Sequence, residues 1–154
     1  VPPAPAPPSA KPRSTARSKP EFAARSLENR KKNIFTIIAG GLSYGQGSSR
    51  EHAAICPMYL GVRAIMAKSF ERIHSGNLVN FGILPLVFKS EADYDRISQG
   101  MDFSMTGLIE AVKRGSLITV NTGGTLIELE LLATQRQRGI LLAGGLLNYT
   151  RNSI

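Results

Sequence analysis

The sequence predicts an α/β fold with a mostly parallel sheet, and two observations lead to this expectation. Short apolar runs rich in β-branched residues occur at 34–38, 62–68 and 83–88. Between them lie two segments, 48–60 and 70–81, whose apolar residues follow helical spacing and which glycines close. Strand and helix that alternate in this way are typical of parallel strands joined by right-handed crossovers.

Each of the first elements has its own signature. A short helix is expected from about Pro20 to Lys31, because proline is well tolerated in a first helical turn. The run 34–38 is apolar on both faces, which predicts a central strand of a covered sheet. Pro85 interrupts the run 83–88 and removes a backbone donor, so this strand is expected at an edge or at a bulge.

The C-terminal third predicts a hairpin followed by a helix. Two apolar strands within 117–132 surround the turn signal Asn-Thr-Gly-Gly, and residues 125–132 alternate apolar and polar, so that one face is partly solvated. Thr134 and Gln137 then have the spacing of a capping box, which opens a last helix that continues to about Tyr149.

The first 18 residues form a leader that we expect to be disordered, and residues 19–154 are expected to form one domain. Seven of the nine prolines lie in 1–20, and proline-rich chains favour extended conformations without a core. Residues 1–32 hold eight of the 19 Lys and Arg and two of the 11 acidic residues, within a net charge of +8. The remainder is nearly neutral, so the basic charge is a weak indication of nucleic-acid binding.

Composition excludes several classes of protein. Cys56 is the single cysteine, so the chain has neither a disulfide framework nor a cysteine-rich metal site, and we expect Cys56 to be buried in a helix. We expect His52 and His74 to be structural residues. No apolar run is long enough to span a membrane, and no secretory signal is recognised. A cytoplasmic protein with no metal or cofactor ligands of its own is expected.

The stretch Gly41–Ala54 holds the strongest functional signal. A glycine-rich loop leads into a helix N-terminus at Ser48-Ser49-Arg50, where free backbone amides favour a bound anion. Arg50 adds a guanidinium that grips a carboxylate at two points, so the junction suits a small polycarboxylate or a phosphate. The alternative is purely structural: Ser48 caps the helix, and Glu51 completes a capping box.

The residues 44–88, which contain Gly-Ser-Ser-Arg-Glu-His-Ala, resemble the C-terminal swivelling domain of aconitate hydratase. The tail Ile-Leu-Leu-Ala-Gly-Gly-Leu-Leu-Asn-Tyr-Thr, residues 140–150, resembles the end of bacterial-type aconitases. The likeness extends from about Lys19 to Tyr149. It implies a three-layer β/β/α swivelling domain of a hydro-lyase that isomerises citrate to isocitrate through cis-aconitate in the tricarboxylic acid cycle.

The resemblance also implies roles for residues. Ser48 corresponds to the catalytic base, and Ser49 and Arg50 to residues that bind a substrate carboxylate. The complete enzyme carries a 4Fe-4S iron–sulfur cluster whose ligands lie in other domains, so the partner expected is a set of cluster-bearing domains or a large subunit. The isolated chain is then expected to be inactive.

Two departures and several alternatives remain open. The family's usual first segment, a strand with an Asp-rich motif, is absent; Arg13 echoes the arginine that follows it, but its neighbours do not match and we assign it no role. Alternative identities are the small subunit of an isopropylmalate isomerase or homoaconitase, and an RNA-binding regulatory aconitase fragment, with RNA the less favoured partner. The mitochondrial matrix is the alternative location.

Overall fold

The computed structural model describes residues 19–47 and 51–152. The leader expected to be disordered, residues 1–18, therefore lies outside the described residues. The helices are α1 (Lys19–Lys31), α2 (His52–Tyr59), α3 (Arg72–Asn80), α4 (Ala92–Asp95), α5 (Leu108–Arg114), α6 (Gln135–Leu142) and α7 (Leu146–Arg151). The strands are β1 (Thr36–Gly40), β2 (Val62–Ala67), β3 (Leu84–Phe88), β4 (Ser104–Met105), β5 (Ile118–Thr122) and β6 (Thr125–Leu131).

The strands form one sheet in the order β1-β2-β3-β6-β5-β4. β1, β2 and β3 pair in parallel, with α2 and α3 as the crossovers between them. β3 then pairs with β6 antiparallel, and β6, β5 and β4 continue the antiparallel half. The α/β class, the parallel strands joined by helices and the C-terminal hairpin followed by helix are confirmed.

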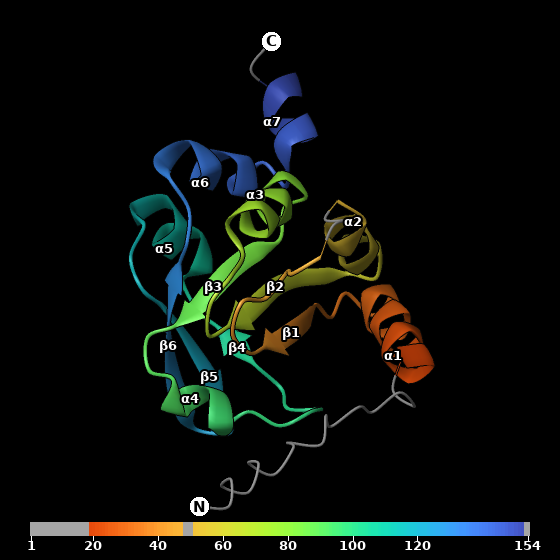
Figure 1. Cartoon of the computed structure of the whole chain (residues 1–154), viewed down its shortest axis with the longest axis vertical. Helices are drawn as coiled ribbons and strands as arrows, with labels where there is room; N and C mark the ends of the chain where they lie inside the picture. Colours follow the sequence, from red (N-terminus) through yellow and green to blue (C-terminus); the bar gives the residue numbers. More distant parts are fainter. Residues whose placement is uncertain (1–18, 48–50, 153–154) are drawn as a thin grey trace, which may run out of the picture.

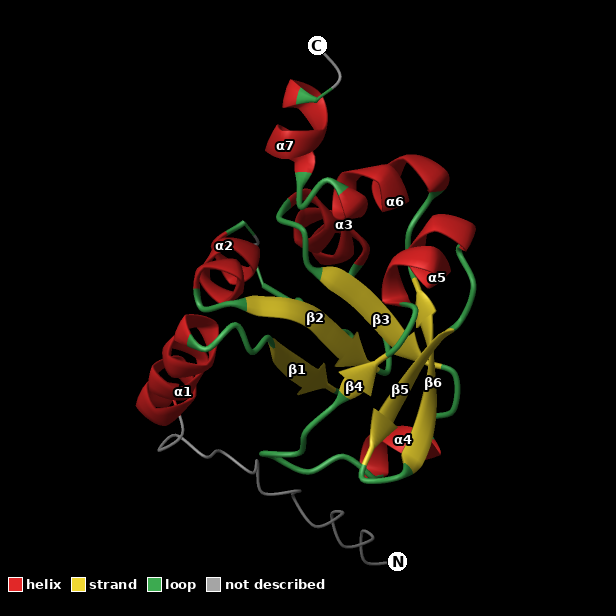
Figure 2. Ribbon diagram, turned by 180° about the vertical axis from the view of Figure 1, so that it is seen from behind, coloured by secondary structure: helices red, strands yellow, loops and turns green. Residues whose placement is uncertain are grey.

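The sheet curls, and this creates three layers (Figure 1). Side chains alternate across β2: Ala64 and Met66 point into one core, and Ile65 points into the other. The first core also takes its buried residues from β3, α5, β5 and β6, which fold across one face of β2 (Figure 2). The second core lies between the sheet and the helices α1, α2 and α3. The layers are thus strands, strands and helices.

β1 is an edge strand, so the expectation of a central strand was wrong. It pairs with β2 on one side, and no other described strand pairs with it. Ile34 and Phe35, the first two residues of the apolar run, precede the strand and are 51% and 65% exposed. The apolar run does form a strand, as expected. That strand has one neighbour and one open edge, and it is not enclosed by two neighbours.

Pro85 lies in a strand with neighbours on both sides, so the edge or bulge expected there was also wrong. The carbonyl of Pro85 accepts a hydrogen bond from Leu132 N at 3.2 Å, which means that the proline nitrogen faces the same side. Leu132 lies one residue beyond the end of β6. The lost ladder bond therefore falls where β6 ends, and the pairing of β3 with β2 is unaffected.

The C-terminal segment forms two helices, where one helix had been expected. Thr134 accepts a hydrogen bond from Gln137 N, and the Gln137 side chain accepts one from Thr134 N, which confirms the capping box. Gly144 and Gly145 have φ angles of +80° and +127°, and these stop α6 and begin α7. A Cβ on Gly145 would lie 2.9 Å from the Asn80 carbonyl oxygen, so the break also allows close packing against the end of α3.

Three elements in the C-terminal half were missed, the helices α4 and α5 and the strand β4. α5 carries Lys113 and Arg114 in its last turn and ends at Gly115 in the left-handed conformation. Basic residues followed by glycine are an ordinary signal of a helix end, and this one was available in the sequence.

Candidate functional site

The glycine-rich loop 41–47 is fixed along the segment that follows β2. Tyr44 N donates to Ser69 O and Glu71 N donates to Tyr44 O, both at 2.9 Å, which makes an isolated parallel bridge between Tyr44 and Phe70. Ser43 N donates to Ser69 Oγ at 2.7 Å. The loop therefore has a defined path across the sheet before it reaches α2.

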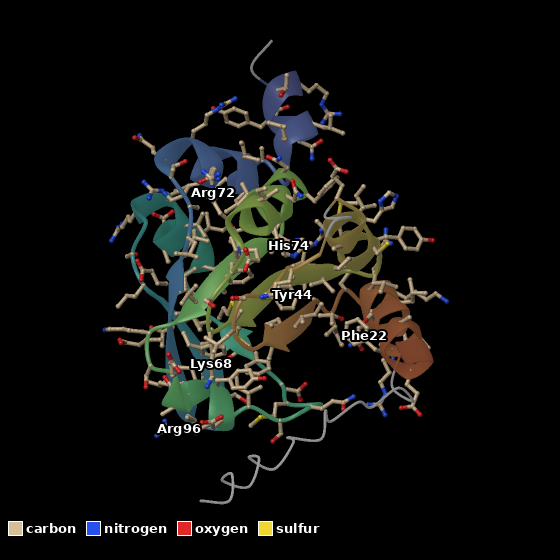
Figure 3. The ribbon with its side chains drawn as sticks, viewed as in Figure 1. Phe22, Tyr44, Lys68, Arg72, His74 and Arg96 are labelled. Carbon is tan, nitrogen blue, oxygen red and sulfur yellow. The ribbon has the colours of Figure 1, made fainter. Side chains whose placement is uncertain are left out.

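The Tyr44 ring packs inside this connection. It contacts the Phe70 ring edge-on at a centroid distance of 5.8 Å and the His74 imidazole at 5.5 Å (Figure 3). A Cβ on Gly40, where β1 ends, would overlap the Tyr44 ring. Burial raises the pKa of the Tyr44 phenol above its usual value of 10. Tyr44 therefore acts as a neutral aromatic support that connects the end of β1 to α3.

His74 lies in α3 beneath the next loop residue, Gly45. The imidazole is 1% exposed, which agrees with the expected structural role. Gly45 has a φ angle of +99°, and a Cβ there would overlap His74. His52, by contrast, is exposed in the first turn of α2, and the structural role expected for it stays a prediction.

The predicted site residues Ser48, Ser49 and Arg50 lie outside the described residues. Their roles as base and as carboxylate ligands therefore remain predictions. The two flanking residues are described: Gly47 ends the loop, and Glu51 is the N-cap of α2 with helical backbone angles. The Glu51 side chain makes no cap hydrogen bond, and the Ser48 half of the expected capping box is untested.

Three cationic side chains near the loop differ in their exposure: Arg63 on β2, Lys68 just after β2, and Arg72 on α3. Arg63 and Arg72 are exposed. The Lys68 side chain is only 19% exposed; its ammonium lies 5.0 Å from the centre of the Tyr94 ring and 3.7 Å from a Glu91 carboxylate oxygen. The aromatic ring thus shields a cation at the end of β2, a feature that sequence spacing alone does not reveal.

The residues of this chain do not fit an iron–sulfur cluster. Such clusters are held by several cysteine thiolates, and the chain has one cysteine. Cys56 is exposed on α2, so its expected burial was wrong. Within 19–47 and 51–152, no three His, Cys, Asp or Glu side chains gather as metal ligands. None of the described helices is long and apolar enough to cross a membrane.

Sequence reasoning missed that Tyr44 and Gly45, in the loop before the junction, both pack against His74. The signal was present, because a glycine next to an aromatic residue, two residues before the Ser-Ser-Arg junction, suggests a tightly packed approach. Recognising the partner needed the fold, since α3 follows the loop only after β2 intervenes.

Comparisons with known proteins agree with this arrangement. A model of the family described as Aconitase C-terminal domain matches residues 9–91. The mitochondrial aconitate hydratase of Saccharomyces cerevisiae is 48% identical over 81 residues, which cover 53% of this chain and 10% of that protein. The mitochondrial homocitrate dehydratase of the same yeast is 42% identical over 92 residues, which cover 60% of this chain and 11% of that protein.

A solved structure shares the fold. The 3-isopropylmalate dehydratase of Methanocaldococcus jannaschii superposes with a TM-score of 0.62 at 32% identity, over 82% of this chain and 70% of that chain. The chain spans between 9% and 17% of the length of the curated relatives it matches. Since the family model covers more than half of the residues and the fold agrees, the chain belongs to the aconitase C-terminal domain family.

Proposed function

We propose that this chain supplies the swivelling domain of an aconitase-type hydro-lyase that converts citrate to isocitrate through cis-aconitate. In this proposal Ser48 is the base, and Ser49 and Arg50 bind a substrate carboxylate. Relatives named as an aconitate hydratase and a homocitrate dehydratase support the hydro-lyase class.

The observation that carries the proposal is the fixed approach to the Ser-Ser-Arg junction. Backbone hydrogen bonds hold Tyr44 to the segment after β2, and His74 packs beneath Gly45. On the other side, Glu51 occupies the N-cap position of α2, which is eight residues long. A rigid framework around polar residues is what precise positioning of a substrate requires.

The chemistry of the proposed step follows from the residue types. Ser48 first gives its own proton to solvent water; the alkoxide then takes a proton from the substrate carbon and becomes a neutral hydroxyl. The backbone amides at the start of α2 and the Arg50 guanidinium favour negative charge and so stabilise the alkoxide. Arg50 also holds a carboxylate at two points, which orients the substrate carbon toward the serine oxygen.

In this proposal the chain is inactive alone. The cluster of the complete enzyme has its ligands in other domains or in a large subunit, because this chain offers one exposed cysteine. Its partner is therefore a cluster-bearing polypeptide, and its substrate is a tricarboxylic acid of the tricarboxylic acid cycle. The relatives' names include the word mitochondrial, which supports the mitochondrial matrix as the location and not the cytoplasm.

A second candidate is the small subunit of an isopropylmalate isomerase. It is favoured by the solved 3-isopropylmalate dehydratase, of which this chain covers 70%. The two candidates share the same site and differ in the substrate, so a comparison of citrate with isopropylmalate as substrates distinguishes them.

The test is reconstitution with the remainder of the yeast aconitate hydratase, produced without its matched segment. Mixing it with this chain should restore conversion of citrate, followed by the ultraviolet absorbance of cis-aconitate, whereas the chain alone should show none. Arg50→Lys should weaken substrate binding, and the exposed Arg63→Lys is the matched control. Turnover by the lone chain, or equal activity of Arg50→Lys and Arg63→Lys, would contradict the proposal.

A further inference from the structure

A groove of about 850 Å³ runs beside the open edge of β1. Its walls are α1 and the segment 94–103, which connects α4 to β4. Apolar side chains line it from both walls and from the start of β1: Phe22, Ile34, Phe35, Ile97, Met101 and Phe103. Phe35 is 65% exposed, although it lies in the most apolar run of the sequence.

We propose that this groove docks an extended segment of polypeptide from outside this chain, which adds as one more strand to the edge of β1. The edge is open on the groove side, because β2 is the strand that β1 pairs with in the described part of the chain. Alternate N–H and C=O groups of an edge strand face away from the sheet and template a further strand. Phe35 and Ile34 supply the apolar contact beside it.

The charged side chains that line the groove indicate which kind of polypeptide segment binds there. The ionisable residues that line the groove are Arg25 and Glu28 on α1, and Asp95 and Asp102 on the opposite wall. Lys32 pairs with Glu28 at 2.8 Å. Asp95 and Asp102 are therefore left against Arg25, and the groove carries a net negative charge. The segment that fits best is therefore an apolar strand that carries Lys or Arg at its ends.

Two other occupants fit less well. A second copy would have to present its own β1 edge, and two copies of this groove carry charge of the same sign, which disfavours their pairing. Residues 1–18 of this chain are rich in proline, which has no N–H to donate to a strand ladder. Polypeptide from outside is available in the family, because this chain covers 70% of the solved dehydratase and 10% and 11% of the two yeast proteins.

The test measures binding without turnover and so does not depend on the proposed function. The probes are fluorescent 12-residue peptides that overlap along the yeast aconitate hydratase outside its matched segment, added to the full chain. At least one apolar peptide with basic ends should bind, with saturable anisotropy. Hydrogen exchange of the outward amides of β1 should then slow, while the amide of Thr36, which already donates to Gly61 O, should not change.

Two variants and a control locate the site. Phe35→Ser should raise the peptide Kd about tenfold or more, since it removes a large apolar contact. Asp102→Lys should weaken the basic peptide as well, whereas Leu147→Ser, which alters an 86% exposed residue on α7, should leave its Kd unchanged.

Several results would overturn the proposal. These are the absence of any binding peptide, and binding that Phe35→Ser does not weaken. A dimer in sedimentation that Phe35→Ser dissolves would assign the groove to a second copy. Binding that occurs only after residues 1–18 are deleted would assign the groove to the leader.

Discussion

His74 occupies the space that a side chain at Gly45 would need. A Cβ on Gly45 would overlap the Cβ, Cγ and Cδ2 atoms of His74, and Gly45 has a φ angle of +99°. The two residues belong to different elements, the loop after β1 and the helix α3, and their contact brings the glycine-rich loop directly onto the buried imidazole. The path of the chain toward the Ser-Ser-Arg junction therefore depends on this one close approach.

Gly45→Ala should destabilise the fold by about 2 to 4 kcal/mol, because left-handed strain and overpacking add. The midpoint of urea unfolding measures the loss. Gly47→Ala is the control for strain alone, since its φ angle is +130° but nothing lies within 4 Å; it should cost about 1 kcal/mol. Gly41→Ala has neither problem and should be neutral. Equal losses at all three positions would contradict the role of His74.

Removing the whole His74 side chain should relieve the clash, because its Cβ overlaps the added methyl group as well as the ring does. His74→Gly alone leaves a cavity and places a glycine within α3, so it is expected to be destabilising. In that background Gly45→Ala should cost at least about 1 kcal/mol less than in the parent chain, which a double-mutant cycle of unfolding free energies measures. Additive losses would mean that the methyl group at position 45 meets something other than His74.

The buried Tyr44 phenol predicts a loss of stability at alkaline pH. Its pKa is raised in the folded chain, so above about pH 10 the unfolded chain releases this proton first and gains stability relative to the fold. The contribution of Tyr44 to the free energy of unfolding is complete below the pKa of the unfolded chain. It is lost as the pH rises through the pKa of the folded chain. Tyr44→Phe should show a smaller decrease in unfolding free energy between pH 9 and pH 11. Tyr59→Phe, at an exposed position, should keep the parent decrease.

Ser48→Ala in the reconstituted enzyme should lower kcat by about 10² to 10⁴-fold with little change in KM, because a base acts in the transition state. Ser104→Ala, on exposed β4, is the control. If Ser48 only caps α2, the same change costs about 1 kcal/mol of stability and spares turnover. Ser48→Asp separates the two roles, since aspartate caps a helix but forms no alkoxide. Full activity of this variant would mean that Ser48 only caps the helix and is not the base.

Thr134→Ala should cost about 1 kcal/mol, because it removes one half of the capping box at the start of α6. Thermal unfolding gives the difference. Thr134→Ser keeps a hydroxyl at the same position and should retain most of the stability; if serine and alanine behave alike, the cap contributes nothing.

The sequence predicted the structure correctly where contacts between residues close in the chain determine it. The helix from about Pro20 to Lys31, the strand that ends at Ala67 and the capping box at Thr134 all depend on contacts within a few residues. The hairpin is of the same kind, since its turn glycines and its alternating pattern lie in one stretch.

The remaining features depend on distant partners. Pro85 is acceptable inside the sheet because β6, which spans Thr125–Leu131 far along the chain, ends opposite it. Phe35 is exposed because no described strand covers the edge of β1. The Gly45 and His74 contact needs β2 to place α3 beneath the loop. No local pattern contains this information.

The position of β3 between β2 and β6 also affects how the sheet is completed during protein synthesis. During synthesis β1, β2 and β3 leave the ribosome well before residues 125–131, so β3 has an unpaired side until the last third of the chain emerges. Bare strand edges of this kind promote association between nascent chains. Until β6 is synthesised, the strand β3, which later lies inside the sheet, therefore has an exposed edge that can associate with other chains. Chaperones that shield strand edges matter most during that interval.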